Sequence, residues 1–98
     1  MADVERNEAE SRFEVRVGDD VAFAEYRVDG DSIVFPHTVT PEALQGQGLA
    51  GQLAEAGLTY ARDQQLKVVP RCSFFQGYIA RHPEYRELVH HDHLALIS

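Results

Sequence analysis

The sequence predicts an α/β (α+β) fold: a small mixed sheet of three antiparallel strands, to which a crossover helix adds one parallel strand. Two observations predict this fold. Residues 13–39 hold three stretches that suit strands and are joined by short turns, and residues 45–51 form a glycine-rich turn before a helical pattern and a short apolar run. Because a helix joins the third and fourth strands, these two are expected to run parallel.

The antiparallel part rests on alternation and turn signals. Residues 13–17 alternate apolar and polar side chains, which is typical of a half-buried strand. A second strand is expected over 21–28 and a third over 32–39, because the Asp-Gly pair at 29–30 favours a tight hairpin. Pro36 lies inside the third strand and cannot donate a hydrogen bond to a ladder. We therefore expect that strand to separate from a neighbour near its C-terminal end.

The parallel part follows the glycine-rich turn. A helix is expected over 49–64, because its apolar and small side chains form a wide stripe that can pack closely on a sheet. Residues 66–70 suit a short buried strand, and residues 74–81 suit a second helix that Pro83 ends. Residues 83–89 are expected to add one helical turn.

The chain predicts one domain, over 12–89, between two polar ends. Ninety-eight residues suit a single domain, and the 44% hydrophobic content allows a small core. Residues 1–11 have no hydrophobic period and are expected to form a flexible acidic tail. Residues 90–98 are expected to form a C-terminal tail.

Charge is concentrated in the first third of the chain. The net charge is −7, and residues 1–31 alone hold ten acidic against four basic side chains. This acidic front argues against nucleic acid as a partner and suits a cationic one, such as a basic small molecule or a protein tail. The alternative interpretation is that the acidic residues serve solubility alone.

Cysteine content and hydropathy bear on the compartment. Cys72 is the only cysteine, so the chain cannot form an internal disulfide. No apolar stretch resembles a leader or a membrane span. We expect no membrane association and a reducing, cytoplasmic location.

The glycine-rich turn is the strongest functional signal. Gly46, Gly48 and Gly51 fall within six positions, immediately before the predicted helix. Glycine lets the backbone approach a ligand closely, and the first amides of a helix have no partner within it. Together these features predict a phosphate site. The residues expected to bind a pyrophosphate are Gln45, Gly46, Gln47, Gly48, Leu49, Ala50 and Gly51.

Two other phosphate motifs are excluded. Residues 46–51 match the spacing of a dinucleotide fingerprint, but residues 40–45 separate them from the preceding strand. The next strand ends in Pro70-Arg71 rather than in the acidic residue that would bind a ribose. A P-loop is excluded because no Lys-Ser/Thr follows the glycines.

The same turn fits the pattern Gln/Arg-x-x-Gly-x-Gly/Ala over residues 45–50. It resembles the coenzyme A pyrophosphate loop of the GNAT superfamily of N-acetyltransferases. Together with three further segments, it resembles a minimal subgroup of that superfamily. The resemblance covers residues 13–89. The further segments are Phe35-Pro36-His37-Thr38-Val39, Val69-Pro70-Arg71-Cys72 and Tyr78-Ile79-x-Arg81-His82-Pro83-Glu84-Tyr85.

The resemblance implies how a cofactor would bind. In GNAT folds the strand before the loop and the strand after the helix splay apart, and acetyl-CoA enters the V between them. By that analogy, main-chain groups around His37, Thr38 and Val39 would bind the pantetheine arm. The chain lacks the usual N-terminal strand and helices that commonly form the acceptor pocket, so the acceptor stays open.

Two residues are the main catalytic candidates. Cys72 lies where a strand passes into a helix, and three roles are open: an acyl-accepting nucleophile, an unreactive lining of the thioester site, or a core residue. Tyr78 best matches the GNAT tyrosine that serves as the acid for the coenzyme A thiolate, with aromatic packing as the alternative and Tyr85 as the second match. His37 and Glu25 are weaker candidates for a base.

Residues 90–93 (His-His-Asp-His) have the composition of a metal cluster. No second group of ligands with Cys/His spacing accompanies them, so we expect a solvated tail and no metal.

The sequence thus predicts an acetyl-CoA-dependent N-acetyltransferase that acts on an unidentified amine of a small molecule or of a protein lysine or N-terminus. One alternative is a module that binds coenzyme A or acyl-CoA with little or no catalysis. Another is an interaction domain in which the glycine turn is only structural.

Overall fold

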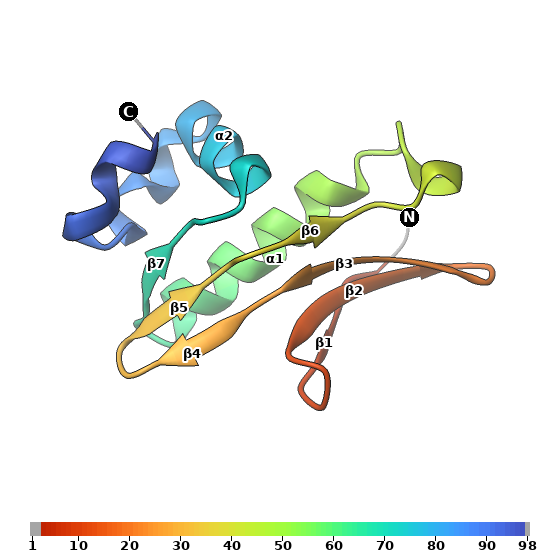
Figure 1. Ribbon diagram of the computed structural model, residues 1–98, viewed down its shortest axis with the longest axis horizontal. Helices are drawn as coiled ribbons and strands as arrows, with labels where there is room; N and C mark the ends of the chain where they lie inside the picture. Colours follow the sequence, from red (N-terminus) through yellow and green to blue (C-terminus); the bar gives the residue numbers. More distant parts are fainter. Residues whose placement is uncertain (1–2, 98) are drawn as a thin grey trace.

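The computed structural model describes residues 3–97. Its strands form two sheets, and the chain passes from one sheet to the other at residue 26 and again at residues 35–37 (Figure 1). Its elements, in chain order, are β1 (Glu5–Asn7), β2 (Arg12–Val17), β3 (Asp20–Glu25), β4 (Arg27–Asp29), β5 (Ser32–Val34), β6 (Thr38–Val39), the 3₁₀ helix η1 (Glu42–Leu44), α1 (Leu49–Asp63), β7 (Lys67–Val69), α2 (Ser73–Arg81), and the 3₁₀ helices η2 (Pro83–Leu88) and η3 (His91–Ile97).

The two sheets have the predicted mixture of pairings. The first has the order β1-β2-β3-β6 and is antiparallel throughout, and the second has the order β4-β5-β7. Within the second sheet, β5 and β7 run parallel because α1 carries the chain back between them. The predicted fold class, an α/β fold in which a crossover helix adds a parallel strand to antiparallel ones, is therefore confirmed.

Two predicted strands are each divided in two. The strand expected over 21–28 breaks at Tyr26, whose N–H donates to the Ser11 carbonyl (2.9 Å) rather than to the hairpin partner. The strand expected over 32–39 breaks around Pro36, which has no N–H. As a result β5 pairs with β7, whereas β6 pairs with β3. The expected separation lies at this proline, where the chain passes from one sheet to the other.

Helix α1 covers one face of the sheet and forms the core with it (Figure 1). Its residue Gly57 has a structural reason, because a Cβ atom there would lie 2.8 Å from the Phe35 ring. Phe35 stacks on Phe75 of α2, with ring centroids 4.3 Å apart, so α1, α2 and the end of β5 meet at this glycine. Both helices are thereby held in place against the point where the sheets divide.

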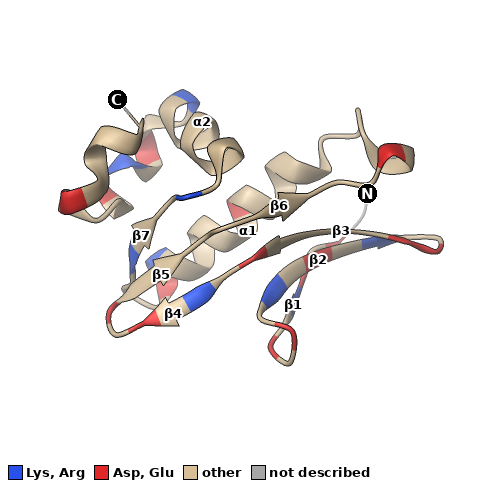
Figure 2. Cartoon of the chain, in the orientation of Figure 1, with Lys and Arg blue, Asp and Glu red and all other residues tan. Residues whose placement is uncertain are grey.

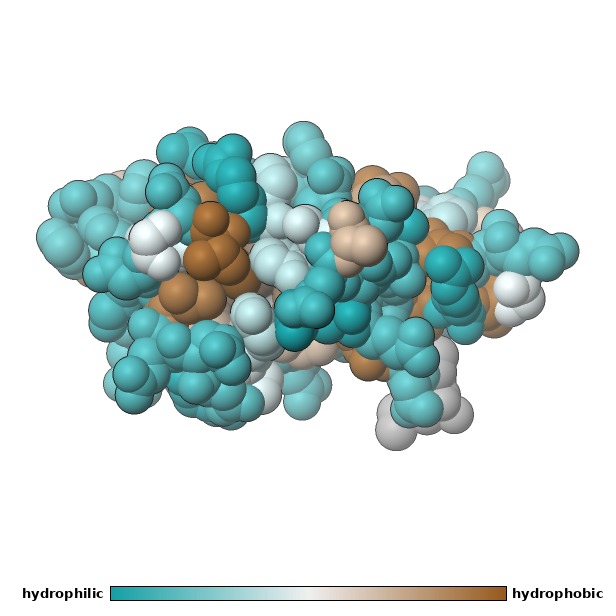
Figure 3. Space-filling view, turned by 90° about the horizontal axis from the view of Figure 1, so that it is seen from below, coloured by the Kyte–Doolittle hydropathy of each residue, from teal (hydrophilic) through white to brown (hydrophobic). Residues whose placement is uncertain are grey.

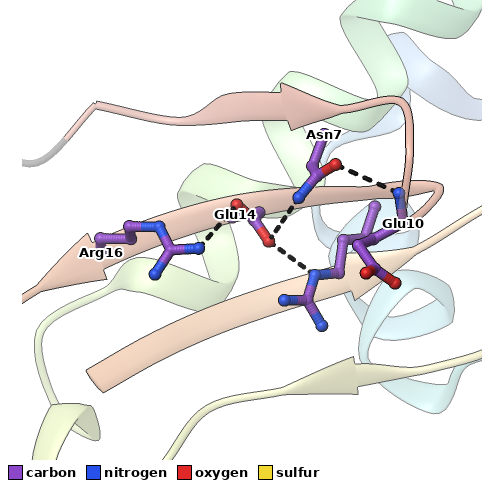
Figure 4. Close-up of polar contacts among 5 residues, drawn as sticks. Asn7, Glu10, Glu14 and Arg16 are labelled. Carbon is purple, nitrogen blue, oxygen red and sulfur yellow. Dashed lines mark hydrogen bonds and ion pairs between the residues drawn. The ribbon is translucent and has the colours of Figure 1, made fainter. Parts of the chain in front are cut away.

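The N-terminal segment is not wholly a tail. We expected residues 1–11 to be flexible, but Glu5–Asn7 form β1 and pair with β2, while residues 1–2 lie outside the described part. The reason is a set of polar contacts, which the hydrophobic periodicity of the sequence cannot reveal. The Asn7 amide donates to the buried Glu14 carboxylate (3.2 Å), and the Asn7 Oδ1 accepts the Glu10 N–H (3.1 Å; Figure 4).

The C-terminal segment also differs from the expected tail. Val89 forms a parallel bridge with Val68, and the His90 N–H donates to the Val68 carbonyl (2.8 Å). Residues 91–97 then form η3, which contacts α2, and Ile97 is buried. Apolar residues at the end of this segment hold it against the domain, although its histidines suggest a solvated end.

The surface is mainly polar. Figure 2 shows acidic residues gathered at the turns that join β1 to β2, β2 to β3 and β4 to β5. Seen from below, hydrophilic residues dominate and hydrophobic areas are separate from one another (Figure 3). Among residues 3–97 the longest helix, α1, has 15 residues, and none combines the length and the apolar character that crossing a membrane requires.

Candidate functional site

The glycine-rich turn joins η1 to α1 and is exposed to solvent. Gly46 and Gly48 have left-handed backbone angles, with φ of 84° and 73°. Other residues adopt this region only at a cost, which explains two of the three glycines of the motif. A Cβ atom on either would meet no atom within 4 Å, so both glycines border open space. The turn therefore leaves room for a ligand to approach its backbone from the solvent.

Most amides of this turn have no hydrogen-bond acceptor among the described residues, and that of Gln45 is the exception. The Gln45 N–H donates to the Glu42 carbonyl, and the Gln52 N–H donates to the Gly48 carbonyl. Between them, the N–H groups of residues 46–51 have no acceptor in the part of the chain that the structure describes. Six donors without a partner among the described residues thus lie at the positive end of the α1 dipole. This arrangement can bind a phosphate or diphosphate group.

The two sheets separate after Phe35. The Phe35 N–H donates to the Val69 carbonyl (3.1 Å), and the Cys72 N–H donates to the Phe35 carbonyl (2.9 Å). Beyond Phe35 the chain follows β3 instead of β7. The predicted V between the third strand and the strand after the helix is thus present, and Cys72 lies at its apex.

One residue of β6 directs its main chain toward the gap. The Glu25 N–H donates to the His37 carbonyl (2.9 Å), so these two form a hydrogen-bonded pair of the antiparallel ladder. Because bonded and non-bonded pairs alternate, the next pair, Ala24 and Thr38, is non-bonded, and Thr38 turns its N–H and C=O away from β3. His37 and Val39 instead use main-chain groups within the sheet. Of the three predicted pantetheine contacts, Thr38 has the suitable orientation.

Cys72 is half-buried at the start of α2, and its Sγ lies 3.3 Å from Thr38 Oγ1. The connection before it is fixed by Gln76, whose Nε2 donates to the Pro70 carbonyl (2.9 Å). The sequence indicated the position of Cys72 but not these two partners. Gln76 follows Cys72 by four residues, and residues at this spacing are neighbours on a helix. That spacing was the sequence signal that could have pointed to Gln76.

Tyr78 belongs to α2, and its ring lies against the first turn of α1. A Cβ atom on Gly51 would stand 3.8 Å from Tyr78 Cε2, so the ring borders the predicted pyrophosphate site. The ring stacks on His82 at 4.0 Å between centroids, and His82 Nδ1 lies 2.8 Å from the Tyr78 carbonyl oxygen. Burial, followed by the nearby Tyr85 and Glu55, raises the pKa of Tyr78. Its hydroxyl therefore holds its proton at neutral pH.

The weaker candidates lie apart from this pair or serve packing. Tyr85 is buried, with its ring centroid 6.1 Å from that of Tyr78. The side chains of Glu25 and His37 make no hydrogen bond or ion pair within residues 3–97. Among the described residues, the hydrogen-bond partner of the Cys72 thiol is the Thr38 hydroxyl rather than either of these side chains.

The chain resembles known proteins over most of its length. A family model described as GCN5-related N-acetyl-transferase matches residues 12–88. Among curated proteins, Protein NATD1 of Gallus gallus is 33% identical over 90 residues, which are 89% of this chain and 82% of that protein. Protein NATD1 of Mus musculus and of Homo sapiens are each 34% identical over 83 residues, which are 82% of this chain and 76% and 74% of those proteins.

Proposed function

The chain belongs to the GCN5-related N-acetyltransferase family, and on that premise we propose that it is an acetyl-CoA-dependent N-acetyltransferase. One observation carries the proposal: the unpartnered amides of residues 46–51 begin a helix whose Gly51 lies against α2, and α2 starts beside Cys72, where the two sheets separate. A carrier with a diphosphate at one end and a thioester at the other fits these two features together.

In this proposal the amides of the glycine turn hold the diphosphate. Its negative charge is favoured at the N-terminus of α1, and the absence of side chains at Gly46 and Gly48 leaves the approach open. The Thr38 main chain offers one donor and one acceptor to the amides of the pantetheine arm. Bound acetyl-CoA supplies an acetyl group that is activated as a thioester.

We assign Cys72 a lining role and Tyr78 the role of acid. A cysteine nucleophile needs a base to accept its proton, and the neighbour of Sγ is the Thr38 hydroxyl. The Tyr78 hydroxyl keeps its proton at neutral pH and lies on the helix that borders the gap. By the likeness to GNAT enzymes we assign it the protonation of the departing sulfur. The neutral acceptor amine forms the N–C bond to the acetyl group, the C–S bond breaks, and the proton that the amine loses restores the Tyr78 hydroxyl. The acidic first third favours a cationic acceptor.

Charge in the first turn of α1 tests carrier binding. Ala50→Glu places a carboxylate beside the predicted diphosphate, and Ala50→Gln is its uncharged control. We expect Ala50→Glu to weaken coenzyme A binding about tenfold or more in calorimetry, without loss of thermal stability, since an acid near a helix N-terminus favours the helix. Equal affinities of the two variants, or no binding by the unaltered chain, would contradict the proposal.

Turnover separates the two remaining functions. Thiol release from acetyl-CoA with a panel of amines is expected for the enzyme, and Cys72→Ser should retain it because Cys72 only lines the site. Binding without thiol release would instead select a coenzyme A-binding module. An acetyl adduct on Cys72 in mass spectrometry would contradict the direct transfer.

A further inference from the structure

The start of η3 is a built turn rather than a solvated end. Its backbone is fixed on one side, because the His90 N–H donates to the Val68 carbonyl of β7 (2.8 Å). It is fixed again within the turn, where the His93 N–H donates to the His90 carbonyl (2.8 Å). The side chains of the residues in between therefore start from fixed backbone positions. This turn has no part in the proposed acetyl transfer.

Three side chains of this turn converge. His90, His91 and Asp92 each offer one ligand atom, and these atoms all lie within 4.8 Å of one another. His91 Nε2 is 3.2 Å from Asp92 Oδ1, and His90 Nδ1 is 3.8 Å from Asp92 Oδ2. Two ligands of a tetrahedral zinc ion with bonds of about 2.0–2.1 Å are about 3.3 Å apart. His91 Nε2 and Asp92 Oδ1 thus already have the required spacing, and His90 Nδ1 lies nearer the other oxygen of the same carboxylate.

From this geometry we propose that His90, His91 and Asp92 bind a divalent transition-metal ion, with Zn²⁺ as the best match. Two imidazole nitrogens and one carboxylate oxygen suit Zn²⁺ or Cu²⁺, whereas Mg²⁺ and Ca²⁺ prefer sets of oxygen ligands. His91 and Asp92 are 83% and 69% exposed and His90 is 25% exposed, so an ion can reach the site from solvent. The fourth position of the tetrahedron stays open to water or to His93, whose ring lies 5.5 Å from that of His90.

Two contacts oppose binding and limit its strength. The His90 and His91 rings are stacked, with centroids 4.7 Å apart and planes at 18°, so one ring must turn before both nitrogens face the same ion. The Asp92 N–H donates to His90 Nδ1 (3.1 Å), so the ion must displace this hydrogen bond. An exposed hydrogen bond of this kind stabilises the turn only weakly, and the freed N–H can bond to water. Three metal–ligand bonds exceed that cost. The bound ion would then hold the first turn of η3 at the edge of β7, because His90 is a ligand and its N–H also donates to the Val68 carbonyl.

The test is titration of the full chain, without an added histidine tag, with ZnCl₂ in calorimetry. We expect one Zn²⁺ per chain and no heat of binding with MgCl₂. His91→Ala and Asp92→Ala should each weaken Zn²⁺ binding about tenfold or more, since each removes one ligand of three. His37→Ala removes an exposed histidine outside the turn and should leave the Zn²⁺ affinity unchanged.

A second measurement separates the proposed site from general binding to histidines. Zn²⁺ should slow carboxypeptidase digestion of the unaltered chain, because a fixed η3 presents its end less readily, and should not do so in His91→Ala. The proposal is wrong if Zn²⁺ does not bind, if His91→Ala and Asp92→Ala bind it as the unaltered chain does, or if His37→Ala weakens binding equally.

Discussion

Glu14 and the glycine turn are both polar places in a small apolar fold, and they treat their hydrogen-bonding groups in opposite ways. The Glu14 carboxylate is only 5% exposed and is surrounded by donors (Figure 4): Arg12 Nε at 2.6 Å, Asn7 Nδ2 at 3.2 Å and Arg16 at 3.6 Å. Residues 46–48 of the turn are exposed, and the six N–H groups of residues 46–51 have no acceptor among the described residues.

The difference teaches which polar feature serves the fold and which serves a ligand. A buried polar group destabilises a protein unless it is bonded, so the partners of Glu14 hold β1 on β2 and leave its oxygens occupied. The hollow of about 200 Å³ beside it, lined by Asp3, Glu5, Glu14 and Arg16, is thus next to a saturated carboxylate. Free amides on an exposed turn cost little, because water bonds to them until a ligand displaces it.

The largest expected effect is a loss of stability when the buried carboxylate of Glu14 is removed. Glu14→Ala removes a charged acceptor from a buried site, and we expect the free energy of unfolding to fall by about 1.5–3 kcal/mol. Coenzyme A affinity should stay unchanged, because β2 is not part of the proposed site. Urea unfolding and calorimetry measure the two quantities.

Arg16→Ala is the matched control for that substitution. Arg16 lies on the same carboxylate at 3.6 Å but is largely exposed, so its loss should change stability by less than about 0.5 kcal/mol. If Glu14→Ala weakened coenzyme A binding in proportion to stability, the division between the two regions would be wrong.

The next largest effect is a loss of coenzyme A affinity when a side chain is added to the glycine turn. Gly48 in the turn and Gly30 between β4 and β5 have similar left-handed angles, with φ of 73° and 62°, and both border open space. Alanine at either should therefore destabilise the chain by about 1–2 kcal/mol. Only Gly48→Ala adds a methyl group beside the free amides, so it alone should weaken coenzyme A binding, by about tenfold or more. Equal affinities of the two variants would place the ligand elsewhere.

The sequence was sufficient for the features that depend on local chemistry. Alternation and an Asp-Gly turn predicted the hairpins, and the spacing of the glycines predicted the start of α1. Pro36 predicted the place where the third strand leaves its neighbour, since a missing N–H is a property of the residue itself. The position of Cys72 followed from the same local reasoning.

Features that depend on distant partners could not be predicted in this way. Residues 5–7 form a strand because Asn7 reaches Glu14, and the pairing of Thr38 with Cys72 joins residues 34 positions apart. The C-terminal turn is ordered because Val89 bridges to Val68. Each of these contacts arises only after the chain has folded, so the composition of the segment alone suggested a tail.

The smallest effect concerns pH and separates charge from hydrogen bonding at Glu14. The Arg12 hydrogen bond, opposed by burial, lowers the pKa of Glu14 below its ordinary value of about 4.5. In the unfolded chain this carboxyl takes up its proton at a higher pH than in the folded chain. Its ionic contribution to stability is therefore complete above about pH 5 and is lost as the pH falls through the lowered, folded pKa.

Glu14→Gln measures that contribution, because glutamine keeps the size of the side chain and one acceptor oxygen. The difference in unfolding free energy between the unaltered chain and this variant should be largest near neutral pH and shrink toward about pH 3, by about 1.4 kcal/mol for each unit of the pKa shift. Residues 45–51 contain no titratable side chain, so coenzyme A affinity should be the same for both proteins at each pH. A stability difference that stays constant with pH would mean that Glu14 acts through the number of its hydrogen bonds rather than through its charge.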